Sequence, residues 1–450
     1  MHLNNNVTTK YFKFDAFFYY RTIKFLSALI FSKNIFSFLL LFALLYIQPS
    51  CIEKSSANSA SKLILKEKAI QEGAWLGKLF IDSSTFIPFN FSVLDNTVTF
   101  INDKEKIVAD LEQINNNYQI KMPVFNSLFN FSISNDSLVG FWHNYAKSKD
   151  YKMPFLATFQ GTNISRFKLT CPPTSNIEGE WEVTFGNSDS TKYKAVGLFN
   201  QNGSALSGTF ITETGDYRFL EGIVKKDSLL LSCFDGSHAF LFKAIHQNKS
   251  LIGKFYSGNH YEEQWEAVKN VSFKLQNPDS ITSISSDEDI VFSFPNLDSI
   301  IINYPSSEFS NKVTIIQIIG SWCPNCMDET IFLSNLYDQY NKKGLEIICL
   351  AYEKPNTFKA KCENLKRLIK HADAKYQFLI AGESSKKEVE RTLPFIKNVT
   401  SFPTCIVLDK QGKVKKVHSG FYGPGTNKYY KEYTNEINEL IEKLLTENIN

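Results

Sequence analysis

Two cysteines separated by two residues are the part of this sequence best suited to do chemistry. Cys323 and Cys326 follow a mostly apolar run of strand length and open a segment with helical spacing. At a helix N-terminus, unpaired backbone N–H groups and the helix dipole stabilise a thiolate. We therefore predict that Cys323 is the attacking nucleophile and that Cys326, one turn later, displaces the resulting mixed disulfide.

A zinc site is the rival interpretation of this spacing. Structural zinc needs four ligands, which usually come from two pairs of Cys or His residues. No second Cys-x-x-Cys motif and no pair of histidines at matching spacing follows Cys326. We therefore expect neither a metal nor a cofactor at the dithiol.

The segments around the dithiol alternate between two periodicities. Strand-length apolar runs occupy residues 313–319, 345–351 and 404–408. Helical spacing is found over residues 327–340, 357–370, 386–393 and 429–445. Strands that alternate with helices predict an α/β sheet covered on both faces.

A longer motif surrounds the two cysteines. It comprises Ser-Trp-Cys-Pro-Asn-Cys at 321–326, then Glu329, and later Phe-Pro-Thr at 402–404. This ordered set resembles the TlpA/ResA-like branch of thioredoxin-fold disulfide reductases. The resemblance implies a C-terminal thioredoxin fold over residues 290–450 and a cis Pro403 that faces the dithiol. The side chains expected to contact the substrate are Trp322, Pro324, Phe402 and Pro403.

Glu329 is the third expected catalytic residue. Ordinary thioredoxins carry a buried Asp six residues before the first Cys, where this chain has Gln317. In the family that the motif resembles, a Glu three residues after the second Cys takes a related part, and Glu329 stands there. A partly buried carboxylate has a raised pKa and can exchange the proton of Cys326 near neutral pH. The alternative is a solvated Glu329; Asp328 is expected to be solvated, and His418 to be structural.

The N-terminal segment, residues 1–51, predicts export. An apolar run over 35–47 follows Lys33 and ends shortly before Cys51. The run is short for a bilayer span, which needs about 20 apolar residues, but it suits a signal peptide. Cys51 resembles the lipidated cysteine of a bacterial lipoprotein; an uncleaved membrane anchor is the alternative. Both interpretations place the remaining chain in the cell envelope, on the periplasmic side and tethered to a membrane.

The middle of the chain is predicted to be mainly antiparallel β-structure. Residues 52–68 are polar and form a spacer, and residues 274–289 form a second polar linker. Between them, aromatic and β-branched residues alternate with polar ones in short runs bounded by Asn, Asp, Ser and Gly. The expected fold class is therefore multidomain, with a β region ahead of the α/β domain.

Short motifs recur within the β region. Glu-Gly-x-Trp occurs at 72–75 and 178–181, and Ser-Leu-Val/Ile-Gly at 137–140 and 250–253. These repeats favour two related β-modules over chance recurrence. The expected modules are residues 69–170 and 171–273. Large aromatic residues at strand spacing either fill the cores of these modules or line a ligand site, and core packing is the preferred interpretation for Trp75, Phe89, Phe91, Trp142 and Trp181.

The remaining cysteines do not form a regular disulfide pattern. Cys171 and Cys233 fall in or beside the second module, where an oxidising compartment would allow them to pair. Cys349 and Cys405 sit in apolar runs and are expected to be buried. Cys362 has charged neighbours and is expected to be an exposed thiol.

Composition and motif together define the leading hypothesis. A net charge of +3 lacks the basic excess that nucleic-acid binding needs. We expect a membrane-tethered thiol–disulfide oxidoreductase that reduces disulfides in exported proteins with electrons from a transmembrane donor. By the family resemblance, its substrates include apocytochrome c thiols. The alternatives are an oxidase or isomerase, and a binding protein whose β-modules present a client to the redox domain.

Overall fold

The computed structural model describes most of the chain after the N-terminal segment. The described residues are 69–162, 165–285 and 289–447. Cys51, the expected signal segment 1–51 and the spacer 52–68 lie outside the described residues. Across those described ranges, no helix has both the length and the apolar character that crossing a bilayer requires.

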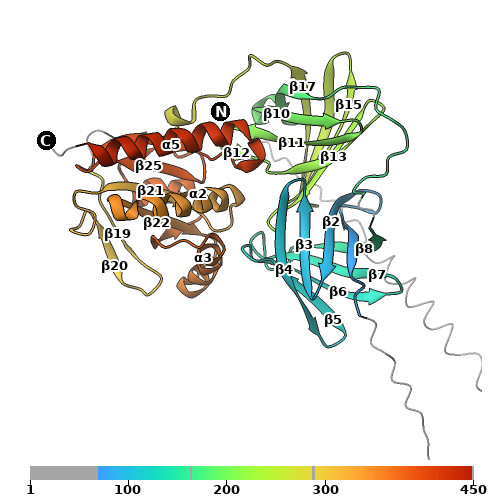
Figure 1. Ribbon diagram of the computed structural model, residues 1–450, viewed down its shortest axis with the longest axis horizontal. Coiled ribbons are helices and arrows are strands. Elements are labelled where there is room, and N and C mark those ends of the chain that lie inside the picture. Colours follow the sequence, from blue (N-terminus) through green and yellow to red (C-terminus); the bar gives the residue numbers. More distant parts are fainter. Residues whose placement is uncertain (1–68, 163–164, 286–288, 448–450) are drawn as a thin grey trace, which may run out of the picture. The chain divides into compact units, whose positions relative to one another are not determined.

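The first β-module is a closed antiparallel barrel (Figure 1). Each strand pairs with the next in sequence, and the last pairs back with the first. Alternation along the strands sends large aromatic side chains inward, where Trp75, Phe89, Phe91 and Trp142 are all buried. The core interpretation of these residues is confirmed. The strands are β1 (Gly73–Phe80), β2 (Phe86–Leu94), β3 (Thr97–Asn102), β4 (Glu105–Ile114), β5 (Asn117–Lys121), β6 (Ser127–Ser134), β7 (Ser137–Asn144) and β8 (Lys152–Gly161).

The second β-module forms another closed ring of antiparallel strands. Its ring closes through the pairing of β10 with β11, and the short strand β12 adds to β11 outside the ring. Trp181 is buried in its core, as expected. The strands are β9 (Gly179–Phe185), β10 (Tyr193–Asn202), β11 (Ala205–Thr212), β12 (Gly215–Asp216), β13 (Leu220–Lys225), β14 (Ser228–Phe234), β15 (Ala239–Gln247), β16 (Ser250–Ser257) and β17 (Tyr261–Lys269).

The sequence repeats occupy equivalent places in the two barrels. Gly73 and Gly179 both have positive φ, 124° and 108°, which favours glycine at the start of β1 and β9. Two residues later, the indole N–H of Trp75 donates to the carbonyl oxygen of residue 71 at 3.0 Å, and that of Trp181 donates to residue 177 at 2.8 Å. The Ser-Leu-Val/Ile-Gly segments begin the penultimate strands, β7 and β16. The two barrels are therefore related structural units.

The C-terminal domain is built on a five-stranded mixed sheet of order β23-β22-β21-β25-β26. The strands β21, β22 and β23 are parallel, and β25 and β26 run antiparallel to them. The predicted strands and helices are present. The elements are β19 (Phe292–Pro295), β20 (Ile301–Tyr304), β21 (Val313–Ile319), α2 (Pro324–Tyr340), β22 (Leu345–Glu353), α3 (Phe358–Ala372), β23 (Gln377–Glu383), α4 (Lys386–Thr392), β24 (Ile396–Lys397), β25 (Thr404–Leu408), β26 (Val414–Ser419) and α5 (Lys428–Thr446).

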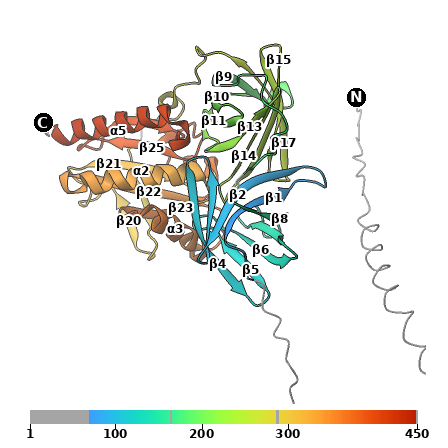
Figure 2. The ribbon, with the colours of Figure 1, turned by 45° about the vertical axis from the view of Figure 1, so that its right-hand side comes forward.

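Both faces of this sheet are covered, as predicted (Figure 2). Ile315 and Ile319 of β21 belong to the apolar cluster that α2, α3 and α5 form on one face. Ile316 and Ile318 belong to the cluster on the other face, with α4 and the β19–β20 hairpin. The alternation along β21 therefore sets which of its side chains can reach α2.

Part of the predicted linker packs on this domain. Strand β18 (Ser283–Ile284) pairs with β24, and Thr282 is buried. Asp279 accepts a hydrogen bond from the imidazole of His418, with Oδ1 and Nδ1 2.6 Å apart. His418 thus helps to hold the incoming chain, which is a structural role.

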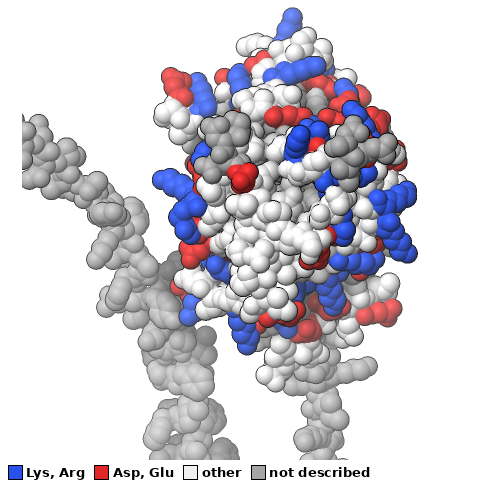
Figure 3. Space-filling model, turned by 90° about the vertical axis from the view of Figure 1, so that its left-hand side faces the viewer, with Lys and Arg blue, Asp and Glu red and all other residues white. Residues whose placement is uncertain are grey.

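Charges of both signs are mixed on the face shown in Figure 3. Lys and Arg side chains alternate there with Asp and Glu around a stretch of uncharged surface. This mixture agrees with the small net charge of +3 for the whole chain.

Candidate active site

The dithiol lies where strand β21 gives way to helix α2. Cys323 is the N-cap residue of α2, and Pro324, whose missing N–H costs nothing at the first helical position, begins the helix. The Cys323 side chain is half-buried, and its Sγ lies 3.4 Å from the carbonyl oxygen of Phe402. The nucleophile predicted from sequence therefore sits at the positive end of the helix dipole.

The two thiols have opposite ionisation tendencies. A hydrogen bond from the Cys326 thiol, helped by the backbone N–H groups of Cys326 and Asn325, lowers the pKa of Cys323 against the opposing effect of burial. Cys326 is fully buried, and burial together with the neighbouring sulfur raises its pKa well above the usual value. This arrangement suits Cys323 as the attacking thiolate and Cys326 as the resolving thiol.

Glu329 is buried beside this pair and is not the solvated residue of the alternative interpretation. Its Oε2 accepts a hydrogen bond from Gln317 Nε2 at 2.9 Å, and Gln317 Oε1 in turn accepts one from the Tyr376 hydroxyl at 3.1 Å. The other carboxyl oxygen, Oε1, is buried with no hydrogen-bond partner. Burial raises the pKa of Glu329 to about 8, so its carboxyl group can carry a proton at neutral pH.

The loop before β25 brings a peptide carbonyl to the nucleophile. The Phe402–Pro403 peptide bond is cis, as the family resemblance implies. The Phe402 ring meets the Trp322 ring edge to face, with centroids 5.6 Å apart. Three of the four predicted substrate contacts, Trp322, Pro324 and Phe402, line a cleft that contains Cys323. Pro403 is buried and does not line it.

Asp328 corrects the prediction of a solvated residue. Its side chain is 8% exposed and forms an ion pair with Arg218 of the second barrel. Burial raises the pKa of Asp328 to about 7, although Arg218 opposes this shift. Arg218 was missed because it lies 110 residues before its partner, and nothing in its local sequence distinguishes it.

Glu353 is a second buried acid that sequence reasoning missed. Its carboxylate accepts hydrogen bonds from the Ser321 backbone N–H at 2.8 Å and from the Ser321 hydroxyl at 2.7 Å. Both oxygens are thereby used to fix the turn that leads into the dithiol. The only signal in the sequence was an acidic residue at the end of an apolar strand.

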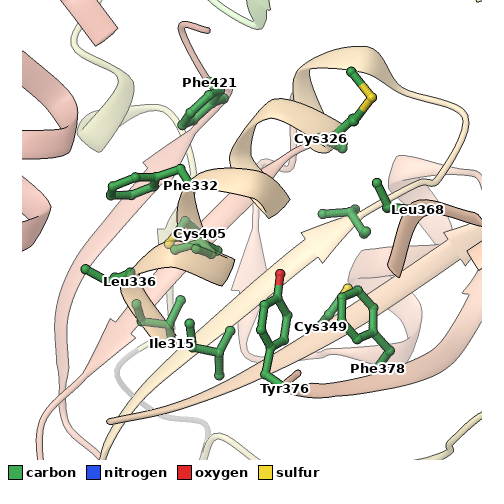
Figure 4. Packing of buried hydrophobic residues seen from close by; sticks show 14 of the residues in the cluster. Ile315, Cys326, Phe332, Leu336, Cys349, Leu368, Tyr376, Phe378, Cys405 and Phe421 are labelled. Atoms are coloured by element: carbon green, nitrogen blue, oxygen red, sulfur yellow. The ribbon is translucent and has the colours of Figure 1, made fainter. Parts of the chain in front are cut away.

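Within the described residues, the cysteines outside the dithiol are free thiols. Cys171 and Cys233 are free thiols, so the suggested disulfide is absent from the structure. Cys362 is buried, which corrects the expectation of an exposed thiol, because its charged neighbours point away from the face of α3 that packs on the sheet. Cys349 and Cys405 are buried in the same apolar cluster, as predicted (Figure 4).

Among the residues that the structure describes, no group of three or more His, Cys, Asp or Glu side chains is arranged to hold a metal ion.

Comparison with known proteins covers the C-terminal domain. The Redoxin family model matches residues 280–432. Thiol-disulfide oxidoreductase ResA of Bacillus thuringiensis subsp. konkukian is 28% identical over 130 residues, which are 29% of this chain and 66% of that protein. ResA of Geobacillus thermodenitrificans is 24% identical over 114 residues, which are 25% of this chain and 58% of that protein. The chain thus spans about two thirds or less of the length of these relatives.

Solved structures were also found. A putative thiol:disulfide interchange protein DsbE from Chlorobium tepidum is 17% identical with a TM-score of 0.27, covering 35% of this chain and 96% of that one. A secreted thiol-disulfide isomerase from Corynebacterium glutamicum is 17% identical with a TM-score of 0.29, covering 39% of this chain and 99% of that one. The Redoxin match and the sequence relatives agree with the fold and the dithiol: the C-terminal part is a thioredoxin-like thiol–disulfide oxidoreductase domain.

The prediction that Glu329 moves a proton can be tested by substitution. Replacing Glu329 with Gln keeps the shape and the hydrogen-bonding capacity but removes the ionisable group. We expect the resolving step of Cys326 to slow by about 100-fold, because a positioned acid–base group contributes roughly that much or more. Stopped-flow oxidation of the dithiol across the pH range should also lose the inflection that Glu329 gives near its pKa of about 8.

Stability supplies an independent readout of the same group. Glu329 is neutral in both states below its ordinary pKa of 4.5, and above that it ionises first in the unfolded chain. Wild-type stability should therefore fall as pH rises from 4.5 to about 8, and Glu329→Gln should lose less over that window. Glu439→Gln, at an exposed position of α5, is the matched control and should follow the wild type. Parallel curves for Glu329→Gln and wild type would mean that Glu329 already ionises in the fold.

Proposed function

We propose that the whole chain is a membrane-tethered thiol–disulfide oxidoreductase that reduces disulfides in exported proteins. The observation that carries this proposal is the pair of opposed thiols at the start of α2, with the pKa of Cys323 lowered and that of Cys326 raised. A structural cysteine pair needs no such division. The catalytic residues proposed are Cys323, Cys326 and Glu329.

The proposed catalytic cycle consists of two thiol–disulfide exchange steps. The Cys323 thiolate attacks one sulfur of the client disulfide, forms a mixed disulfide and releases the first client thiolate. The ionised form of Glu329 then accepts the proton of Cys326, and the resulting Cys326 thiolate attacks the Cys323 sulfur. The Cys323–Cys326 disulfide forms, and the second client sulfur leaves as a thiolate. The client gains two electrons and the dithiol loses two.

A reductase must recover those electrons from outside the domain. We assign this task to a transmembrane donor that reduces the Cys323–Cys326 disulfide, and we include apocytochrome c thiols among the client classes. The ResA name of the sequence relatives supports a role in thiol–disulfide exchange but does not set its direction. An oxidase would use the same two sulfurs in the opposite direction, with the Cys323–Cys326 disulfide taking electrons from client thiols. An isomerase would rearrange client disulfides with no net transfer of electrons.

Trapping of mixed disulfides tests the assignment. A Cys326→Ser variant of the full chain should accumulate mixed disulfides through Cys323, because the resolving thiol is missing. Non-reducing electrophoresis of envelope fractions, followed by reduction and identification of the released proteins, reports the clients. Cys323→Ser is the matched control and should trap none of them.

Equal trapping by both variants would overturn the division between nucleophile and resolver. Direction is settled on the wild-type chain by acid quenching and thiol alkylation in the cell. A dithiol that is mostly reduced supports a reductase, whereas a mostly oxidised one identifies an oxidase.

The tether is tested at Cys51. Metabolic labelling with an alkynyl fatty acid should mark the wild-type chain and leave Cys51→Ala unmarked, because the lipid is attached through that sulfur. Mass spectrometry of the mature N-terminus should begin at Cys51. A chain that retains residues 1–51 and stays in the membrane as Cys51→Ala would identify an uncleaved anchor instead.

A further inference from the structure

The nucleophile opens into a cleft with two walls of different origin. The cleft has a volume of about 820 Å³ and includes Cys323. One wall belongs to the thioredoxin-like domain and contains Trp322, Asn325, Thr400 and Phe402. The opposite wall belongs to the second barrel, whose contributing residues are Tyr193, Thr212, Glu213, Thr214, Gly215, Asp216, Tyr217 and His238.

The barrel wall is in close contact with the dithiol helix and with the loop after β26. A side chain at position 215 would place its Cβ 2.0 Å from the side-chain nitrogen Nδ2 of Asn325, and the φ of Gly215 is +146°. At Gly420 a Cβ would lie 2.9 Å from the backbone of Thr214. The Gly423 N–H donates to Asp216 Oδ2 at 2.6 Å. Only glycine fits at positions 215 and 420. A shift of the barrel wall would break these close contacts and the hydrogen bond to Asp216.

One buried cation fixes this wall. The guanidinium of Arg218, two residues after β12, is 4% exposed. It donates to the Pro324 carbonyl oxygen at 3.3 Å and to Asp328, so it binds the N-terminal part of α2. It also donates to Glu105 of the first barrel and lies 3.9 Å from Asp235 of its own barrel.

The cation therefore joins three parts of the chain through carboxylates. An ion pair of this kind is costly to break once it is buried, because removal of one partner leaves the others uncompensated. Arg218 supplies the positive charge for Glu105, Asp235 and Asp328 together. Both barrels are thus anchored to the helix that carries Cys323.

We propose that the second barrel is a fixed wall of the substrate cleft, positioned by Arg218, and that it selects an extended polypeptide segment carrying a disulfide over a folded protein. The proposal rests on the thiol–disulfide exchange assigned to Cys323 above. A cleft of about 820 Å³ has the capacity of a small-ligand site and cannot admit a folded domain. A short extended segment can enter it with its sulfur directed at Cys323.

Two features of the lining favour peptide over a charged small molecule. Thr400 lines the cleft, and its buried Oγ1 has no hydrogen-bond partner, so a change of its side-chain rotamer would present that hydroxyl to a peptide amide or carbonyl. Three lysines line the cleft, and two of them, Lys192 and Lys194, form ion pairs with Asp189 at 2.8 Å and with Glu182 at 2.7 Å, while Lys386 is the third. With most of this positive charge paired, selection depends more on shape and backbone hydrogen bonding than on net charge.

The experiment compares one disulfide in two settings, using the full chain. The first probe is a short linear peptide bearing a mixed disulfide, and the second is the same sequence grafted into a rigid exposed loop of a stably folded carrier. Hydroxyethyl disulfide reports the intrinsic reactivity of the dithiol. We expect kcat/KM for the linear peptide to exceed that for the grafted loop by about tenfold or more.

Variants of the barrel wall test the cause. Thr214→Trp fills the cleft from the barrel side and should lower kcat/KM for the linear peptide by about tenfold, a larger factor than for the small hydroxyethyl disulfide. Asn200→Trp, at an exposed strand position of the same barrel outside the cleft, should leave both rates unchanged. Arg218→Met frees the wall and should bring the two peptide rates together, while Arg218→Lys restores part of the discrimination.

The possible outcomes distinguish a failure of this proposal from a failure of the proposed thiol–disulfide exchange. Equal wild-type rates for the linear and the grafted peptide would overturn the role of the barrel, as would a Thr214→Trp variant with unchanged peptide reduction. Absence of turnover with hydroxyethyl disulfide would instead remove the proposed function itself. The Thr214→Trp and Asn200→Trp pair decides the matter even if Arg218→Met fails to fold.

Discussion

The structure around the dithiol depends on one requirement, which is to stabilise the negative charge of the Cys323 sulfur. A thiolate at Cys323 must be stabilised without full access to water, and the donors that do so are the Cys326 thiol and the first N–H groups of α2. Those donors are aligned only if the turn before the helix is fixed. Glu353 fixes it by accepting both hydrogen bonds of Ser321, and the parallel sheet places Glu353 at the end of the neighbouring strand.

Two adjacent acids on α2 show how the surroundings divide their functions. Asp328 and Glu329 are both buried, and burial raises the pKa of each, to about 7 and about 8. Asp328 faces a guanidinium and serves as an attachment point for the barrels. Glu329 faces the amide of Gln317 and keeps one oxygen without a partner, which leaves it able to exchange a proton. Neighbouring positions on a helix point about 100° apart, so the two carboxyls meet different parts of the protein.

The sequence alone predicted the features that depend on residues close together along the chain. The dithiol, its helix, the buried strands of the α/β domain and the repeated openings of the barrels were all predicted from spacing and periodicity. The burial of Asp328 was not, because it depends on Arg218, a residue of another domain that local pattern cannot connect to it. Cys362 was misjudged for a related reason: charged neighbours along a helix do not tell which face of it meets the sheet.

The two barrels differ in a strand that lies against the dithiol helix. The first barrel is a simple ring of eight strands, and the second repeats that ring but carries one further strand, β12, outside it. That short strand begins at Gly215, which lies against Asn325, and the chain reaches Arg218 two residues after it ends. Strand β12 and the residues after it are therefore among the elements that reach the dithiol, together with the β14–β15 loop, where the Ser237 hydroxyl donates to the Trp322 carbonyl oxygen at 3.3 Å. Strand β12 and Arg218 thus connect the second barrel to α2, while Glu105 of the first barrel pairs with the same guanidinium.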